Sequence, residues 1–220
     1  MRRAFLLLPL LAGCGAIGTP YVEPRRFPLE PQRAGPPRAA TGRVLLVRTT
    51  RAGPGLETRS LRRIRGDGTL DLAFYEGWLA PPADLAEAAL RAWLTASGLF
   101  AAITAPGSRL AASLVLETEL TALEARVAEG RGRAALSALL LSQPDNEDAR
   151  PVAQFLAEGF APLPAGADAV GQAGAMQAAL GVAFAQVDAR LAQAVLSSSV
   201  NPLPRRGPRP GSWAAPRGAG

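Results

Sequence analysis

The chain has 220 residues, of which 48% are hydrophobic, so it is long and apolar enough to bury a sizeable core. Its formal net charge is +6, and all 24 basic residues are arginine. The two ends carry this excess, because the span 43–200 holds 14 arginines against 16 acidic residues. A nearly neutral domain lacks the electrostatic footprint of a nucleic-acid-binding protein.

The N-terminus has the features of an export signal. Arg2 and Arg3 precede an apolar stretch at 4–11. This length is typical of a signal peptide and is far below the ~20 residues of a membrane-spanning helix. We therefore expect residues 1–13 to be a signal peptide.

The end of this stretch resembles a bacterial lipobox. Leu11, Ala12 and Gly13 lead into Cys14, the only cysteine of the chain. A lipobox directs a diacylglycerol onto the cysteine before cleavage, and several acyl chains together hold a protein on a membrane almost permanently. The alternative, a free thiol after an ordinary signal peptide, would be exposed without a partner in an oxidising compartment. Cys14 is thus the expected lipidation site. Gly15, in place of the aspartate that commonly retains lipoproteins in the inner membrane, favours the outer membrane.

Two segments of unusual composition flank the predicted domain. Residues 14–42 comprise the cysteine and a stretch with six prolines and no hydrophobic periodicity, which predicts a semi-extended linker that holds the domain away from the membrane. Residues 201–220 hold five prolines, four glycines and four arginines without an acidic residue, a composition typical of disorder. A single domain is expected over 43–200.

The first half of this domain has strand patterns. The apolar run at 43–48 predicts a strand. Residues 58–65 and 69–78 predict a hairpin, because Gly66-Asp67-Gly68 between them is turn chemistry. The alternation along the second strand of this hairpin predicts that four apolar residues share one face: Leu70, Leu72, Phe74 and Trp78.

A helix follows, and the pattern then repeats. Two prolines end the hairpin, Asp84 and Glu87 have the spacing of a capping box, and Gly98 is a helix stop. Strands are predicted at 110–125, 131–141 and 151–161, and a long helix at 168–196. The apolar stripe of this last helix predicts a core-facing side and consists of Leu180, Phe184, Val187, Leu191 and Val195. The expected fold is α+β: a two-layer sandwich with a largely antiparallel sheet of about six strands and two main helices, in the order three strands, helix, three strands, helix.

The chain lacks most of the usual catalytic groups. It has no histidine and no lysine, and lipidation would consume Cys14, so we expect no enzyme, no cofactor and no metal. The remaining polar clusters have simpler interpretations. Glu117 and Glu119 are interpreted as an exposed carboxylate pair, and the acidic stretch 145–148 as a solvated turn. Arg62, Arg63 and Arg65 are interpreted as the solvent-exposed side of an edge strand rather than a site for lipid headgroups. The serines at 197–199 are interpreted as a helix end.

Three stretches carry a resemblance to a known family. They are LET at 56–58, YEGWLAPP at 75–82 before the predicted helix, and SGLF at 97–100 where that helix ends. Together with the lipobox they resemble the ABC-type transport auxiliary lipoproteins, the family of paraquat-inducible protein C. The chain departs from that family at Gly77, where an arginine is common, and in its tail. The aromatic residues Trp78 and Phe100 are expected to pack between sheet and helix.

The resemblance implies a function for the chain. It implies a non-catalytic, periplasm-facing outer-membrane lipoprotein that serves an ABC transport system built around mammalian-cell-entry (MCE) domain proteins and moves lipids across the envelope. Its partners would be the MCE-domain protein and the outer membrane, with room for a homo-oligomer. Two alternatives stay open. One is a stand-alone envelope scaffold that contacts peptidoglycan or an outer-membrane assembly machine, and the other is a carrier with an apolar cavity lined from the sheet.

Overall fold

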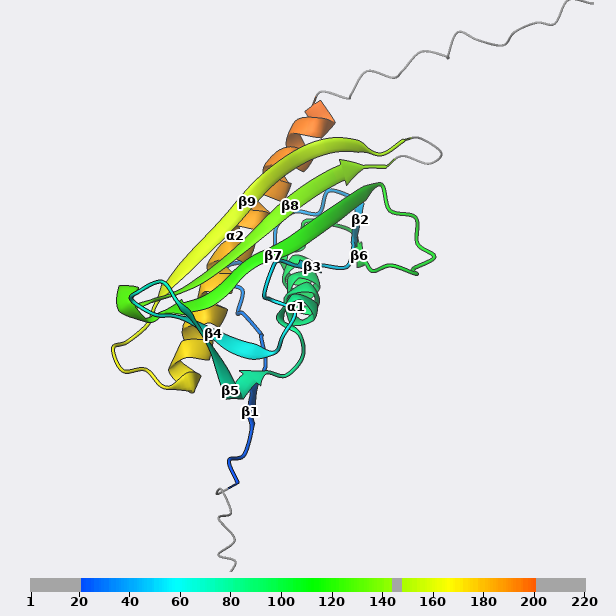
Figure 1. The fold of residues 1–220 in the computed structure, drawn as a ribbon. Helices are drawn as coiled ribbons and strands as arrows, with labels where there is room; N and C mark the ends of the chain where they lie inside the picture. Colours follow the sequence, from blue (N-terminus) through cyan, green and yellow to red (C-terminus); the bar gives the residue numbers. More distant parts are fainter. Residues whose placement is uncertain (1–20, 144–147, 201–220) are drawn as a thin grey trace, which may run out of the picture.

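The fold is α+β, with a mixed sheet covered on one face by two helices (Figure 1). The computed structural model describes residues 21–143 and 148–200, and within them one sheet contains nine strands. The core lies between this sheet and the helices and is built from leucine, alanine and a few aromatic side chains. The α+β prediction is confirmed at this level.

Strand β7 (Leu114–Arg126) is the spine of the sheet. One of its edges pairs along its whole length with the antiparallel strand β8 (Arg131–Ser142). The other edge is shared by three short parallel strands, β2 (Val44–Val47), β3 (Arg51–Ala52) and β4 (Ser60–Ile64). Thirteen residues give β7 the length to hold these separate segments in one sheet.

The remaining strands extend the sheet on both sides. Antiparallel pairs join β4 to β5 (Leu70–Trp78) and β8 to β9 (Arg150–Pro162), whereas β1 (Arg25–Phe27) and β6 (Ala102–Thr104) add in parallel to β5 and β2. All six predicted strands are present and follow the predicted order around the two helices, but the predicted number is too low, because the described residues form nine strands. The additional strands β1, β3 and β6 have two or three residues each, too few for any periodicity, and they are strands only because they pair with distant parts of the chain.

A bulge in β5 reverses the face of half its side chains. Ser60 of β4 is opposite Gly77, while Arg62 is opposite Leu72, so two steps of β4 match five steps of β5. The three additional residues are an odd number, and an odd shift moves the following residues to the other face. Trp78 is therefore buried, whereas Phe74 is 83% exposed. The prediction of one common face for Leu70, Leu72, Phe74 and Trp78 is wrong.

Helix α1 (Pro82–Ser97) begins without the predicted capping box. Its N-cap is Pro81, which makes no side-chain hydrogen bond to the helix. Glu87 instead accepts a hydrogen bond from the backbone N–H of Thr50 at 2.7 Å, and so ties α1 to the chain next to β3. The predicted stop is confirmed: Gly98 has a left-handed φ of 70° and donates its N–H to the carbonyl of Thr95.

Helix α2 (Ala169–Val200) lies across the inner face of β8 and β9 (Figure 1). It is the one helix in the described part of the chain that is long and apolar enough to cross a membrane by length and composition. Its predicted stripe is buried, with Leu180, Phe184, Val187 and Leu191 at 0% exposure. The apolar sequence of α2 is therefore accounted for by its packing in the core of the domain. On its flank, the amide of Gln186 accepts from the N–H of Glu158 and donates to its carbonyl, and so covers the outer edge of β9.

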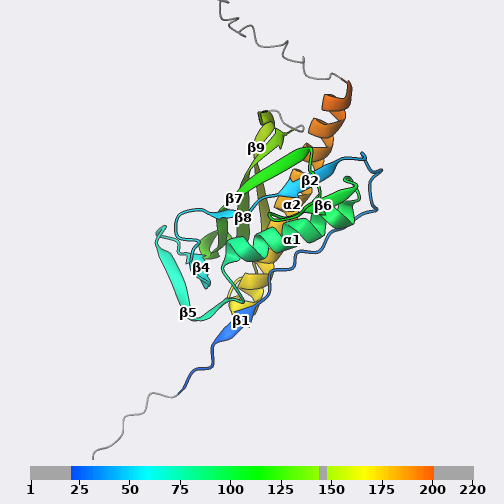
Figure 2. The same ribbon diagram turned by 90° about the vertical axis from the view of Figure 1, so that its right-hand side faces the viewer.

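The segment before β2 is packed on the domain. Residues 25–41, here called the strap, form β1 and then run alongside α1 before turning into β2 (Figure 2). Leu29 is buried, and the N–H groups of Arg38 and Thr41 donate to the carbonyls of Ser97 and Leu99 at the end of α1. The prediction of a linker up to residue 42 that holds the domain away is wrong for these residues. Its prolines favour the extended conformation, but backbone pairing and one buried leucine fix it to the domain.

Candidate functional site: an apolar groove beneath the strap

A buried carboxylate on α2 holds the strap. Asp188 is 4% exposed, and its Oδ2 accepts a hydrogen bond from Nε of Arg38 at 3.2 Å and lies 3.7 Å from Nη2 of Arg33. Farther up the strap, the N–H of Glu30 donates to the side-chain oxygen of Gln177 at 3.0 Å. These contacts place the strap over the seam between α1 and α2.

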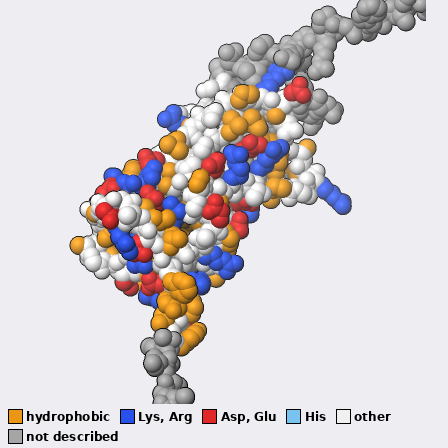
Figure 3. All heavy atoms as spheres, in the orientation of Figure 1, with side chains coloured by type: hydrophobic (Ala, Val, Ile, Leu, Met, Phe, Trp, Pro, Cys, Tyr) orange, Lys and Arg blue, Asp and Glu red, His pale blue; other side chains and the backbone are white. Residues whose placement is uncertain are grey.

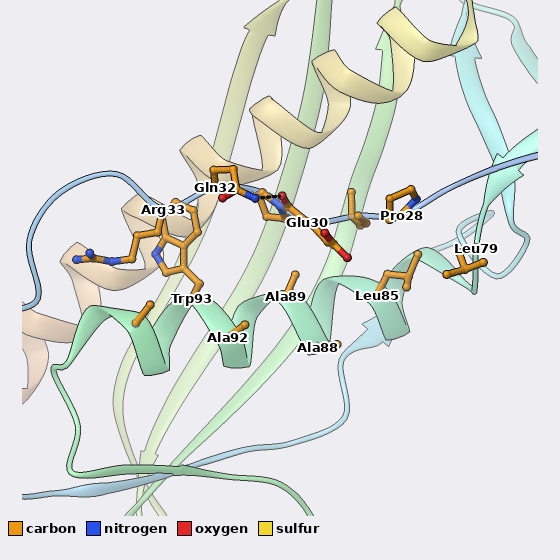
Figure 4. Close-up of a pocket in the computed structure, with 13 residues that line it drawn as sticks. Pro28, Glu30, Gln32, Arg33, Leu79, Leu85, Ala88, Ala89, Ala92 and Trp93 are labelled. Atoms are coloured by element: carbon orange, nitrogen blue, oxygen red, sulfur yellow. Dashed lines mark hydrogen bonds between the residues drawn. The ribbon is translucent and has the colours of Figure 1, made fainter.

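The strap leaves a groove against α1. The groove has a volume of about 580 Å³ and lies between residues 28–33 and the outer face of the helix. Its helix wall is made of small side chains, since Ala88, Ala89, Ala92 and Ala96 recur at helical spacing. Figure 4 shows the strap crossing above α1, with Trp93 and Leu85 rising from the helix toward it. The groove exists because alanines cannot fill the space beneath a strap that is fixed at both ends.

Trp93 separates this groove from a second hollow. The second hollow has about 440 Å³ and lies between the strap and α2. The indole packs edge-on against Phe184 at a centroid distance of 5.7 Å. Its Nε1 is buried and has no hydrogen-bond partner among the described residues. Trp93 is therefore chiefly a spacer that holds the strap, α1 and α2 together.

The groove can bind apolar groups and offers little for catalysis. Of its thirteen lining residues only Glu30 and Arg33 are ionisable, and both belong to the strap. Within 21–143 and 148–200, no group of three or more histidine, cysteine, aspartate or glutamate side chains is placed to hold a metal ion. The groove is also lined by the strap, by α1 and by Leu79 after β5, which differs from the sheet-lined cavity that a carrier was expected to need.

The predicted lipidation site lies outside the described residues. This applies to Cys14 and to its lipobox, Leu11, Ala12 and Gly13, as well as to the tail 201–220 and to most of the acidic stretch 145–148. Lipidation, the signal peptide and the nature of the tail therefore stay predictions.

The candidate carboxylate pair is matched by arginines. Glu117 accepts a hydrogen bond from Arg48 at 2.7 Å, and Glu119 accepts one from Arg51 at 3.2 Å. Arg51 belongs to β3, and Arg48 directly follows β2, where its N–H donates to the carbonyl of Leu116 in β7. The two glutamates therefore lie in cross-strand ion pairs, as the simpler interpretation predicts.

The arginines in and directly after β4 are engaged within the protein. Arg62 donates to the carbonyl of Gly55, and Arg63 and Arg65 lie 3.7 and 3.3 Å from the carboxylate of Asp71. The expected edge strand is wrong, because β4 lies between β5 and β7. The parallel pairing of β4 with β7 joins segments about sixty residues apart, and no local pattern shows it.

Each of the stretches that carry the family resemblance places apolar side chains in the core. Leu56 and Trp78 are 1% exposed, and Phe100 is 7% exposed, in the same core cluster. The strap contacts two of these stretches, one at each end of α1. Phe27 of β1 pairs with Trp78 before the helix, and a β-carbon added at Gly98 after the helix would lie 3.1 Å from the carbonyl oxygen of Arg38. The expected burial of Trp78 and Phe100 is confirmed.

Sequence reasoning missed Asp188 and the groove. A signal for Asp188 was present, because it follows Phe184 by four residues and so falls on the apolar face of the last helix. A carboxylate there requires partners, which the arginines of the strap supply. The alanines of α1 gave no such signal, since small residues on a helix are equally compatible with close packing.

No family model matches the chain, and no curated protein matches it. Solved structures share its fold. The crystal structure of protein XCC0632 from Xanthomonas campestris, assigned to the family model DUF330, superposes with a TM-score of 0.67 at 19% sequence identity, covering 79% of this chain and 99% of that chain. The structure of the hypothetical protein CT253 from Chlamydia trachomatis gives a TM-score of 0.53 at 10% identity, covering 71% of this chain and 99% of that one. At such identities the likeness shows a common fold.

Proposed function

We propose that the chain is a non-catalytic lipoprotein of the outer membrane that faces the periplasm and serves as the auxiliary component of an MCE-type ABC lipid transport system. Cys14 would carry the lipid, and the MCE-domain protein would be the partner. We also propose that the sheet and the two helices form the two layers of the predicted sandwich.

One observation carries the proposal: the strap, which follows the lipobox in the sequence, is fixed to two of the three family-like stretches. Its strand β1 pairs with Glu76, Gly77 and Trp78 before α1. After α1, the carbonyls of Ser97 and Leu99 accept hydrogen bonds from the strap. These contacts join the segment that follows the lipobox to the folded domain, as a membrane-anchored docking protein needs.

The distribution of charge is compatible with a docking role. The arginines described on the sheet and strap are largely balanced by nearby carboxylates, such as Arg133 between Glu124 and Glu158. Desolvation opposes the charged form of Arg133, but hydrogen bonds to both glutamates outweigh it and raise its pKa. A surface neutralised in this way favours association through shape and apolar contact over attraction to polyanions.

Membrane attachment tests the first half of the proposal. Cys14→Ser, expressed behind an ordinary cleavable signal peptide in place of residues 1–13, should move the cleaved protein from the membrane to the soluble fraction, because the predicted lipidation site is lost. The measurement is membrane fractionation after a high-salt wash, with acyl chains on the wild-type N-terminus detected by mass spectrometry. A cleaved variant that resists extraction as well as the wild type would refute lipid anchoring.

Partner capture tests the second half and separates it from the scaffold alternative. Wild-type protein purified from detergent-solubilised envelopes should bring an MCE-domain protein with it, and a gene deletion should give an envelope-permeability defect that the wild-type gene restores. Deletion of 201–220 should leave both results intact, because the folded domain makes the contact. If the deletion abolishes capture and complementation at an unchanged melting temperature, the arginine-rich tail is the docking element and the scaffold alternative is favoured.

A further inference from the structure

An exposed apolar patch lies at the end of the molecule where the described chain begins. We call it the β5 patch. Figure 3 shows hydrophobic side chains at this end, beside the start of the grey N-terminal residues. Its members come from the bulged part of β5 and from its neighbours, and each is between 44% and 85% exposed: Tyr21, Val22, Leu72, Phe74, Tyr75 and Leu79.

The patch is part of the fold rather than the result of a loose segment. Phe74 and Tyr75 stack edge to face at 4.9 Å, which fixes both rings. They lie in the bulge of β5, and the strand is paired on both sides of it: with β4 at Leu72 and Gly77, and with β1 from Glu76 onward. Two adjacent aromatic rings in water cost free energy, at about 25 cal/mol per Å² of apolar area. Such a cluster marks a surface that another phase or molecule covers.

The length of the chain before the patch indicates what covers it. Cys14 precedes Tyr21 by seven residues, a distance of at most about 25 Å in a fully extended chain. The strap is not free to add to this reach, because β1 pairs with β5 beside the patch and Asp188 holds the strap farther along. A lipid on Cys14 would therefore keep this end of the domain near the bilayer.

We propose that the β5 patch docks on the phospholipid surface, with Phe74, Tyr75 and Leu79 inserted at the level of the headgroups. This inference rests on the lipidation of Cys14 in the proposed function. Aromatic rings and leucine are the side chains that favour the membrane interface. The lipid anchor and the patch together would fix the orientation of the domain, so that α1 and the groove face a constant direction.

The charges around the patch are balanced. Arg25 lies 3.6 Å from Glu76, and Asp71 faces Arg63 and Arg65. The exposed Glu23 and Arg26 have opposite signs. Docking therefore relies on apolar insertion, and it should occur on zwitterionic as well as anionic lipids with little dependence on salt. This separates it from the salt-dependent contacts expected of the arginine-rich tail.

A thiol placed in the patch can report its contact with lipid. The chain has no cysteine other than Cys14, so Phe74→Cys gives one free thiol in the mature lipoprotein. Leu156→Cys is the matched control, because Leu156 is 61% exposed on β9 and lies on the outer face of the sheet. Each variant is labelled with a fluorophore and reconstituted in phosphatidylcholine vesicles, and quenching by aqueous iodide is measured. The same variants in the Cys14→Ser background give the lipid-free reference.

We expect iodide quenching at position 74 to fall at least fivefold on vesicles relative to the lipid-free reference, and quenching at 156 to change less than twofold. Equal quenching at the two positions on vesicles overturns the inference. Protection of position 74 in the lipid-free form, increasing with protein concentration, also overturns it and assigns the patch to a second copy. Protection that requires the MCE-domain protein assigns it to that partner.

The same samples separate this inference from the proposed function. If the labelled variant carries acyl chains and floats with the vesicles, but position 74 stays accessible to iodide, the docking inference is wrong and the proposed lipoprotein function stands. If the mature protein carries no acyl chains and does not float with the vesicles, both the proposed lipid anchor and the docking inference are wrong. Equal melting temperatures for Phe74→Cys, Leu156→Cys and the wild type exclude misfolding as the cause.

Discussion

A methyl group added at Gly159 should lower the stability of the domain more than one added at any other position of β9. Helix α2 crosses β9 so closely here that a β-carbon on Gly159 would lie 2.7 Å from the backbone nitrogen of Ala183 and closer still to the carbonyl oxygen of Ala179. Both neighbours are helix backbone, which no change of rotamer can move. Gly159→Ala must therefore push α2 away from the sheet.

The cost follows from the distance. Ordinary van der Waals contact begins near 3.4 Å, so the helix would have to retreat by about 0.7 Å or more. Overpacking of this kind costs about 1–3 kcal/mol, and we expect the upper part of that range because a retreat of α2 also loosens Leu180 and Phe184. In a domain of this size about 2–3 kcal/mol lowers the melting temperature by roughly 5–10 °C.

Gly174 is the matched control in the same helix. A β-carbon there would meet no atom within 4 Å, and alanine is a better helix former than glycine by about 1 kcal/mol, so Gly174→Ala should raise the melting temperature by a few degrees. Urea unfolding of the purified protein, followed by circular dichroism, gives both free energies. If Gly159→Ala changes the free energy of unfolding by less than about 0.5 kcal/mol, the close approach of α2 to β9 is refuted.

Three further predictions concern single residues. Leu191→Ala removes a fully buried side chain of α2 and should cost about 2–5 kcal/mol in urea unfolding; a cost below ~0.5 kcal/mol would mean that the stripe is not core. Asp188→Ala removes the carboxylate that holds the strap, so trypsin should cut after Arg38 roughly tenfold faster while the domain core stays resistant, and an unchanged rate would place the hold elsewhere. The pKa of Asp67 is lowered by hydrogen bonds from the hydroxyl and N–H of Thr69, so the stabilisation of the hairpin turn by this carboxylate is present above its ordinary pKa and is lost as pH falls through the lowered value. Thr69→Ala should move that pKa back up in a carbon-13 titration, and an unchanged pKa would show that the hydroxyl is not the main cause.

Local patterns in the sequence predicted the long elements well. Both helices and the six longer strands lie where apolar patterns and turn residues indicated, because each buries apolar side chains and each is bounded by glycine or proline. The core stripe of α2, with Phe184 and Leu191, could be read from spacing alone. The lipobox around Cys14 is likewise a property of sequence, and its chemistry is still to be measured.

The candidate site could not be predicted in the same way. The groove requires a proline-rich segment to fold back over α1, and composition gave a free linker instead. The anchors of the strap are the pairing of β1 with β5, the burial of Leu29 and the ion pairs of Asp188, and each joins parts of the chain far apart. Polar or proline-rich composition shows that a segment cannot form its own core, but not that it cannot dock on another.

The face of the β5 side chains shows the same division most clearly. Alternation in the sequence determined that Leu72, Phe74 and Trp78 belong to one strand. The bulge opposite β4 decided that Trp78 would enter the core and Phe74 would point to solvent, because a strand has a period of two and any odd insertion in the pairing reverses its faces. Periodicity is a property of neighbouring residues and can be read from the sequence. Register depends on which strand pairs with β5 and at which residues, so only the tertiary structure determines it.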